Sequence, residues 1–185
     1  MPRISLDPPR SLVLRLVSWY SRRKFGTVIE PVLAAGHHPG VLLVGGIFEV
    51  GTERWKALDP GLKQLALMAS AARIECTWCM DFGHWSAEEM GLPMERVQHV
   101  PRWREHREIF SAMELDVMEY AEAMTDTPPR VPDELAERLL GRLGEKAFVE
   151  LTMTVAVENM RSRTNSAFGL TGQGFSDHCE VPFQG

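Results

Sequence analysis

The spacing of apolar residues is the feature that most restricts the fold of this chain. No window shows the sustained alternation of apolar and polar residues that is typical of a half-buried β-strand. Apolar residues recur three and four positions apart instead, between breaks rich in Gly and Pro. This pattern predicts an all-α protein. We expect helices over residues 11–25, 61–72, 75–90, 110–124, 132–143 and 145–168. The apolar stretch 41–50 is short enough to be either a strand or a buried helix.

Length and composition narrow the class of protein. A chain of 185 residues with 44% hydrophobic and 24% charged residues is typical of one globular domain. No run of about 18 apolar residues predicts a membrane span. The net charge of −5 excludes a general nucleic-acid binder. We expect a helical arm over 1–36, a helical domain over 37–176 and a tail over 177–185.

The charge is unevenly distributed. Residues 1–24 carry six basic side chains against one Asp, a net +5, which leaves −10 on the remainder of the chain. One interpretation is a helix that lies on a membrane surface or binds an acidic partner. The other is an arm that packs on an acidic body, including that of a neighbouring subunit. The apolar face of the arm is short and is interrupted by Arg15, which favours packing.

The three cysteines give the chemical signal. Cys76 and Cys79 form a C-x-x-C, and Cys179 lies about a hundred residues away. An odd, sparse count without a signal peptide predicts a cytoplasmic protein. A C-x-x-C at the start of a helix places two sulfurs about one turn apart, where free amides and the helix dipole stabilise a thiolate. That arrangement suits thiol–disulfide exchange or peroxide reduction. The alternatives are a zinc site, completed by His84, Cys179 or distant histidines, and two buried thiols of a core helix.

The sequence around this motif resembles a known family. The segment LKQLALMASAARIECTWCMDFGHWSAEEMGLPMERV resembles the core motif of the carboxymuconolactone decarboxylase and alkylhydroperoxidase D-like (AhpD-like) family. The later segments LDVMEYAEAMTDTPPRVPDEL, EKAFVELTMTVAVENMRSRTNSAFGL and GQGFS extend the resemblance over about 37–176. It implies an AhpD-like helical bundle that assembles into a homo-oligomer, commonly a trimer or hexamer.

The resemblance also implies a chemistry. Peroxidase members use the C-x-x-C as a redox centre, with a small hydroperoxide as substrate, an external dithiol as electron donor and no bound metal or cofactor. By this resemblance Cys79 attacks the peroxide. Cys76 is then the more exposed partner that closes the disulfide and receives the reductant.

Two positions depart from the family pattern. Peroxidase members carry His four residues after the second Cys and Glu twelve residues before the first, whereas this chain has Gly83 and Gln64 there. Gln can form hydrogen bonds but does not titrate. His84 comes one residue later than the family His, which turns it about 140° away from Cys79 on an ideal helix. A π-bulge between Met80 and Gly83 would bring it into register.

These observations predict a thiol-dependent peroxidase or disulfide oxidoreductase with an antioxidant role. Its catalytic residues are Cys76, Cys79 and His84, and its proton relay is degenerate. One alternative is a decarboxylase or isomerase of a carboxylated lactone, with Arg73, His84 and Arg161 as candidate groups by type. The other is a catalytically degenerate oligomeric binding scaffold.

Overall fold

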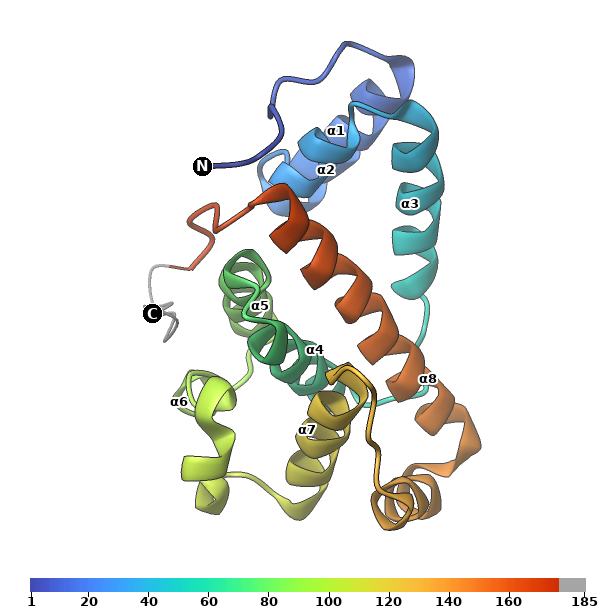
Figure 1. The fold of residues 1–185 in the computed structure, drawn as a ribbon, viewed down its shortest axis with the longest axis vertical. Coiled ribbons are helices and arrows are strands. Elements are labelled where there is room, and N and C mark those ends of the chain that lie inside the picture. The colour runs from blue at the N-terminus through green and yellow to red at the C-terminus, as the bar shows by residue number, and fades with distance from the viewer. Residues whose placement is uncertain (177–185) are drawn as a thin grey trace.

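The structure is a computed structural model that describes residues 1–176, and every regular element in that range is a helix (Figure 1). This confirms the predicted all-α class. The helices are α1 (Leu12–Phe25), α2 (Glu30–Ala35), α3 (Pro39–Thr52), α4 (Pro60–Ile74), α5 (Thr77–Glu89), α6 (Met94–Val97), α7 (Ala112–Thr125) and α8 (Asp133–Phe168), with 3₁₀ turns η1 (Val100–Glu105) and η2 (Arg107–Ile109) between α6 and α7. None of the helices in this range is long and apolar enough to cross a membrane.

Local sequence signals start and interrupt these helices. Ser11 caps α1 by accepting the Leu14 N–H, and Ser111 forms a capping box with Glu114 at the start of α7. The long helix α8 is interrupted at Gly144, whose φ of 75° and ψ of 164° are not helical. The two helices predicted on either side of this residue are therefore present, and Figure 1 shows the change of direction between them.

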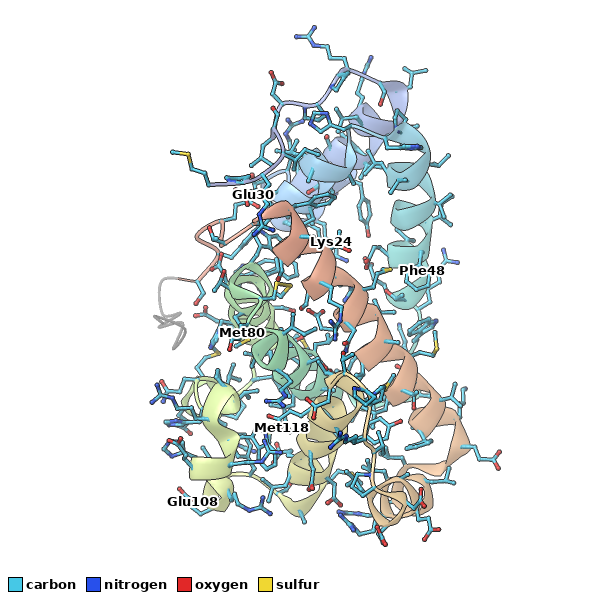
Figure 2. The ribbon with its side chains drawn as sticks, in the orientation of Figure 1. Lys24, Glu30, Phe48, Met80, Glu108 and Met118 are labelled. Carbon is cyan, nitrogen blue, oxygen red and sulfur yellow. A yellow bond between two sulfur atoms is a disulfide. The ribbon has the colours of Figure 1, made fainter. Side chains whose placement is uncertain are left out.

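Helix α4 lies at the centre of the fold and packs against α5, α7 and α8. Its buried residues are mostly Ala and Ser, together with Gln64, Leu65 and Met68, and the small side chains let these neighbours approach closely. Met80 of α5 and Met118 of α7 fill the interior beside it (Figure 2). This packing holds the start of α5 against the C-terminal half of α8, where the candidate site lies.

Helices α1, α2 and α3 pack on one another beside the C-terminal half of α8 (Figure 1). Stretch 41–50 forms part of α3, so the strand alternative is wrong. The helix is also not buried as expected, because Val44 is 69% and Ile47 66% exposed. Two ion pairs fix this region, Arg161 with Glu49 and Lys24 with Glu53.

Candidate redox site

Cys76 and Cys79 form a disulfide at the start of α5, with their Cα atoms 5.3 Å apart. The chain enters this turn through Glu75, whose positive φ of 61° ends α4. Cys76 is the N-cap residue of α5, and its Sγ accepts the backbone N–H of Cys79 at 3.3 Å. This amide and the positive end of the helix dipole stabilise a thiolate on Cys76 whenever the disulfide opens.

The two sulfur-bearing residues differ in exposure. Cys76 is 1% exposed and Cys79 is 9% exposed. The expectation that Cys76 is the more exposed partner is therefore wrong for this chain. Cys76 is the N-cap residue of α5, and its N–H donates to the Ala71 carbonyl of α4, while Cys79 lies one turn further along α5.

Cys79 is also contacted by α8. The side-chain amide Nδ2 of Asn165 donates to Cys79 Sγ at 3.4 Å, and Asn165 is only 4% exposed. Helix α8 therefore supplies one wall of the site, although its contacting residue lies 86 positions away in the chain.

The two positions that depart from the family pattern face each other. The Gln64 side chain is buried, and its Nε2 donates to the Gly83 carbonyl at 2.8 Å. A Cβ at position 83 would lie 3.2 Å from Met68 Cγ and 3.7 Å from Gln64 Nε2. The space that a side chain at position 83 would need is therefore filled by Gln64 and Met68. By the resemblance, family peroxidases have titrating Glu and His side chains at these two positions. In this chain the two positions are joined by a hydrogen bond between groups that do not titrate.

His84 is buried within α5. Its Nδ1 donates to the Met80 carbonyl at 2.8 Å, one turn back on the same helix. Helix α5 is a regular α-helix over Thr77–Glu89, so it contains no π-bulge that would shift His84 toward the register of position 83. A catalytic role for His84 stays a prediction.

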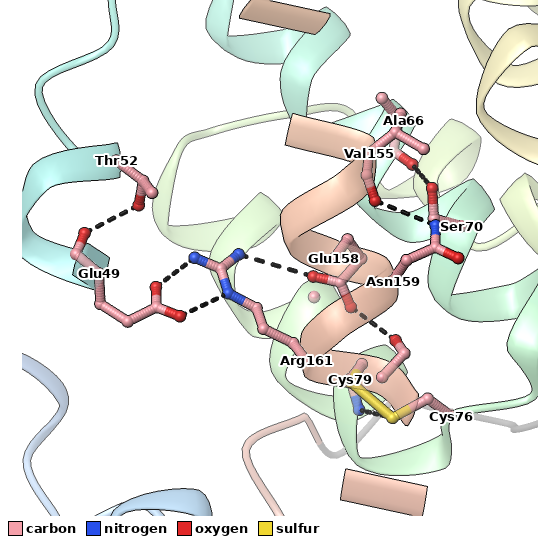
Figure 3. A network of polar contacts seen from close by, with 12 residues as sticks. Glu49, Thr52, Ala66, Ser70, Cys76, Cys79, Val155, Glu158, Asn159 and Arg161 are labelled. Atoms are coloured by element: carbon pink, nitrogen blue, oxygen red, sulfur yellow. Dashed lines mark hydrogen bonds and ion pairs between the residues drawn. A yellow bond between two sulfur atoms is a disulfide. The ribbon is translucent and has the colours of Figure 1, made fainter. Parts of the chain in front are cut away.

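A buried acidic residue, Glu158, completes the polar surroundings of the site. Ser162 Oγ donates to its Oε1 at 2.7 Å, and Arg161 Nη1 lies 3.6 Å from its Oε2 (Figure 3). Arg161 is bound mainly by Glu49 of α3, through Nε at 3.0 Å and through Nη2. Burial is the main cause that raises the pKa of Glu158 to about 7, and the Glu49 charge adds to it against Arg161 and Ser162.

Sequence reasoning missed Glu158, although the chain carries a signal for it. Residues of α8 that repeat at intervals of four and three are all buried, and they change from apolar to polar toward the C-terminus: Leu151, Val155, Glu158, Ser162 and Asn165. A core-facing stripe that continues as Glu, Ser and Asn indicates a buried polar site.

The buried side chain of Asp81 holds the segment that follows α8. Its carboxylate accepts the backbone N–H groups of residues 173, 175 and 176 at 2.8, 3.2 and 2.8 Å. Phe175 is thereby packed edge-on against Phe82, which stacks on Trp78 with ring centroids 5.3 Å apart. Trp85 and Phe25 complete an aromatic cluster that includes Trp78, the residue between Thr77 and Cys79 in the C-x-x-C.

The two arginines that are candidate groups for a lactone carboxylate, Arg73 and Arg161, are both in ion pairs. Arg73 pairs with Asp126, and Arg161 pairs with Glu49 and Glu158. Both arginines are thus neutralised, which gives no support to a site for a lactone carboxylate. Within residues 1–176, no group of three or more His, Cys, Asp or Glu is placed to hold a metal ion. Cys179 lies outside the described residues.

Comparison with known proteins identifies two relatives by sequence. No protein-family model matches the chain. The uncharacterized protein YnjA of Escherichia coli (strain K12) is 32% identical over 183 residues, which span 98% of this chain and 97% of YnjA. The uncharacterized protein YdfG of Bacillus subtilis (strain 168) is 30% identical over 95 residues, which span 51% of this chain and 64% of YdfG.

Two solved structures share the fold at low sequence identity. One is a cysteine-to-alanine variant of the debrominase Bmp8 in complex with 2,3,4-tribromopyrrole, with a TM-score of 0.78, 17% identity and 95% of each chain covered. The other is an uncharacterized peroxidase-related protein from Silicibacter sp. TM1040, with a TM-score of 0.77, 12% identity, and 90% of this chain and 88% of that chain covered. The chain therefore belongs to the same family as YnjA of Escherichia coli, and it has the AhpD-like helical fold.

Proposed function

We propose that this protein is a thiol-dependent oxidoreductase that reduces a small hydroperoxide with the Cys76–Cys79 pair, in an antioxidant role. The observation that carries the proposal is the disulfide at the N-terminus of α5, where the Cys79 N–H and the helix dipole favour a thiolate. The fold shared with a debrominase and a peroxidase-related protein supports enzymatic activity. A pair that needs an external reductant suits the reducing cytoplasm, where we place the protein.

The oxidative half-reaction begins at Cys79, the more exposed of the two residues. Its thiolate attacks one oxygen of the hydroperoxide, the O–O bond breaks, and an alkoxide leaves while Cys79 becomes a sulfenic acid. The Cys76 thiolate then attacks the sulfenic sulfur, and hydroxide leaves and is protonated to water. The hydroperoxide is reduced by two electrons to an alcohol and water, and the two thiols are oxidised to the disulfide.

The reductive half-reaction uses a dithiol donor. A donor thiolate attacks the Cys79 sulfur, the S–S bond breaks, and Cys76 leaves as the thiolate that its N-cap hydrogen bond stabilises. The second donor thiol then attacks the donor sulfur of the mixed disulfide and releases Cys79. The donor is oxidised to a disulfide, and its two protons and two electrons return to the pair.

A peroxide-dependent assay of dithiothreitol oxidation tests this function. Wild type is expected to consume dithiothreitol in proportion to an added alkyl hydroperoxide, and Cys79→Ser is expected to reduce the rate to background. Cys76→Ser should still form a sulfenic acid that dimedone traps, because only the resolving thiol is lost. Wild type that shows no turnover with any hydroperoxide or dithiol would overturn the proposal and favour the scaffold alternative.

A second candidate substrate class is suggested by the aromatic cluster that includes Trp78. Trp78 is buried against Phe82, while Phe82 and Phe175 are partly exposed, and such rings suit contact with a flat aromatic molecule. The debrominase Bmp8, which shares the fold, was solved with a tribromopyrrole. On this alternative, one bromide of an aryl bromide is replaced by hydrogen, and the dithiol supplies two electrons and becomes the disulfide. Release of bromide from tribromopyrrole, dependent on Cys79, would favour it over peroxide reduction.

We also propose that the chain works as a homo-oligomer, a trimer or hexamer. The support is the exposed apolar surface of α1 and α3, on which these side chains are 58–78% exposed: Leu12, Leu16, Trp19, Val41, Val44 and Ile47. Exposed apolar patches of this kind mark interaction surfaces. The packing of α1 against α3, rather than a free basic helix, favours this role over membrane contact.

A further inference from the structure

Glu158 is a buried carboxyl on α8, the helix that contacts Cys79, and the proposed chemistry has not used it. The residue is 5% exposed, and its contacts come from Ser162 and Arg161 of its own helix. Arg161 gives its paired hydrogen bonds to Glu49, which leaves only a 3.6 Å contact for Glu158. The guanidinium therefore compensates the Glu158 charge incompletely.

The geometry of α8 brings this carboxyl toward Cys79. Glu158, Ser162 and Asn165 follow each other at intervals of four and three, so they share one face of the helix. Asn165 contacts Cys79 Sγ, and helix side chains lean toward the N-terminus, so we infer that the sulfur lies over the turn that contains Ser162. Ser162 is fully buried there and donates to Glu158. Figure 3 shows Glu158, Arg161 and the disulfide along the same stretch of α8.

We propose that Glu158 is the proton partner of the Cys79 thiol and acts across the Ser162 hydroxyl. This inference rests on the proposed function for its chemical consequence. It assigns the acid–base role to a residue of α8, in a site where Gln64 and Gly83 offer no titrating group.

The proton follows a closed cycle during peroxide reduction. The Glu158 carboxylate takes the proton of the Cys79 thiol through Ser162, which leaves a thiolate and a neutral carboxyl. The thiolate attacks the hydroperoxide and the O–O bond breaks. The leaving alkoxide takes the proton back from Glu158 and departs as the alcohol, so the carboxylate is restored.

The burial of Glu158 suits this exchange. Its pKa of about 7, raised chiefly by burial, leaves both protonation states populated near neutral pH. The charged groups that act on it are Arg161 on its own helix and Glu49 on α3. Because Glu49 is bound to Arg161, it links the buried carboxyl to the half-exposed surface of α3.

Alkylation of Cys79 measures this coupling without any turnover. The background is the reduced Cys76→Ser/Cys179→Ser protein, in which Cys79 is the single thiol, and the probe is iodoacetamide over pH 6–10. In wild-type context the Glu158 carboxylate ionises first and its charge raises the pH at which the thiolate forms. Glu158→Gln should lower that midpoint by about one pH unit, so that alkylation at pH 7.5 becomes about tenfold faster.

Hydroperoxide turnover should change in the opposite direction. In the full chain, Glu158→Gln should reduce the rate about 100-fold, because the alkoxide has lost its acid. A variant that is merely misfolded would not become more reactive with iodoacetamide and less reactive with hydroperoxide at once. Glu150→Gln is the matched control, since Glu150 is a buried Glu of the same helix bound instead to Lys63 and the Ala57 N–H. It should leave the alkylation midpoint unchanged.

The outcomes separate this inference from the proposed function. If the alkylation midpoint is the same with and without Glu158→Gln in the Cys76→Ser/Cys179→Ser background, the inference is overturned, even when turnover still requires Cys79. A shifted midpoint in a protein that reduces no hydroperoxide supports the proton coupling and overturns the peroxidase proposal.

Discussion

The buried carboxyl of Glu158 makes stability depend on pH in a predictable direction. Its pKa is about 7 in the folded protein against the ordinary value of 4.5. Between these values the native state retains a proton that the unfolded chain has lost, so unfolding releases a proton and stability falls as pH rises. The stabilisation that the Glu158 proton contributes to the folded state is complete below pH 4.5 and is lost as pH rises through 7. Glu158→Gln removes the titration and therefore this loss.

The size of the effect follows from the pKa difference. A shift of about 2.5 units at about 1.4 kcal/mol per unit gives about 3.5 kcal/mol in total. Most of it falls between pH 5 and 8. Over that range Glu158→Gln should therefore gain about 2 to 3 kcal/mol in the free energy of unfolding relative to wild type.

Urea denaturation at fixed protein concentration, in the disulfide form, measures this difference at pH 5, 6, 7 and 8. Glu150→Gln is again the control. Burial tends to raise the pKa of Glu150, but the hydrogen bonds from Lys63 and the Ala57 N–H outweigh it and lower the pKa below 4.5. Its difference from wild type should thus stay flat from pH 5 to 8. If Glu158→Gln is equally flat, the carboxyl ionises as in an exposed side chain and the reasoning about its burial is refuted.

Three further predictions concern other parts of the structure. Gly83→His should lower the free energy of unfolding by about 1 to 3 kcal/mol, because a Cβ there meets Met68 Cγ at 3.2 Å. Gly83→His/Met68→Ala should recover part of this loss in thermal denaturation. No loss in Gly83→His would show that the site has room for the side chain. Asp81→Asn should cost about 1 to 3 kcal/mol and accelerate deuterium exchange of the amides of residues 173, 175 and 176, which lose a charged acceptor; unchanged exchange would contradict the role of Asp81. Val44→Glu/Ile47→Glu should shift the proposed homo-oligomer toward monomer in sedimentation, whereas an unchanged mass would exclude this face of α3 as the interface.

The sequence predicted best those features that depend on residues close together along the chain. The helical period and the Gly and Pro breaks predicted the principal helices, including the interruption of α8 at Gly144. Stretch 41–50 was the exception. A run of apolar residues indicates that a surface avoids water, but it does not indicate what covers that surface. In α3 the exposed side chains of Val44 and Ile47 have no cover within residues 1–176, so burial predicted from one chain was wrong.

In the candidate site too, features local to one helix could be predicted from the sequence, and contacts between distant helices could not. Counting residues along a helix was enough to recognise that Gly83 and Gln64 replace the titrating pair of the AhpD-like peroxidases, and the structure places the two in contact. The same arithmetic cannot reach Glu158 or Asn165, because they approach Cys79 only when α8 packs on α5. The exposures of Cys76 and Cys79 were reversed for a related reason, since Cys76 at the N-cap position donates its N–H to α4.

The loss of both family groups and the presence of Glu158 are connected by the volume of the site. Gly83 has no side chain, so Gln64 extends into that space and binds the Gly83 carbonyl, which closes the α4 side of the pair with a neutral contact. On our proposal the proton partner for Cys79 comes from another element, and α8 is the helix whose Asn165 contacts that sulfur. Glu158, Ser162 and Asn165 extend the buried stripe of α8 toward the sulfur, with Arg161 and Glu49 leading outward to α3. On our proposal, a site can therefore be active without the family relay on α4 and α5. In this proposal α8 supplies the acid–base group, and the Arg161–Glu49 pair connects it to α3, on which Val44 and Ile47 are exposed within residues 1–176.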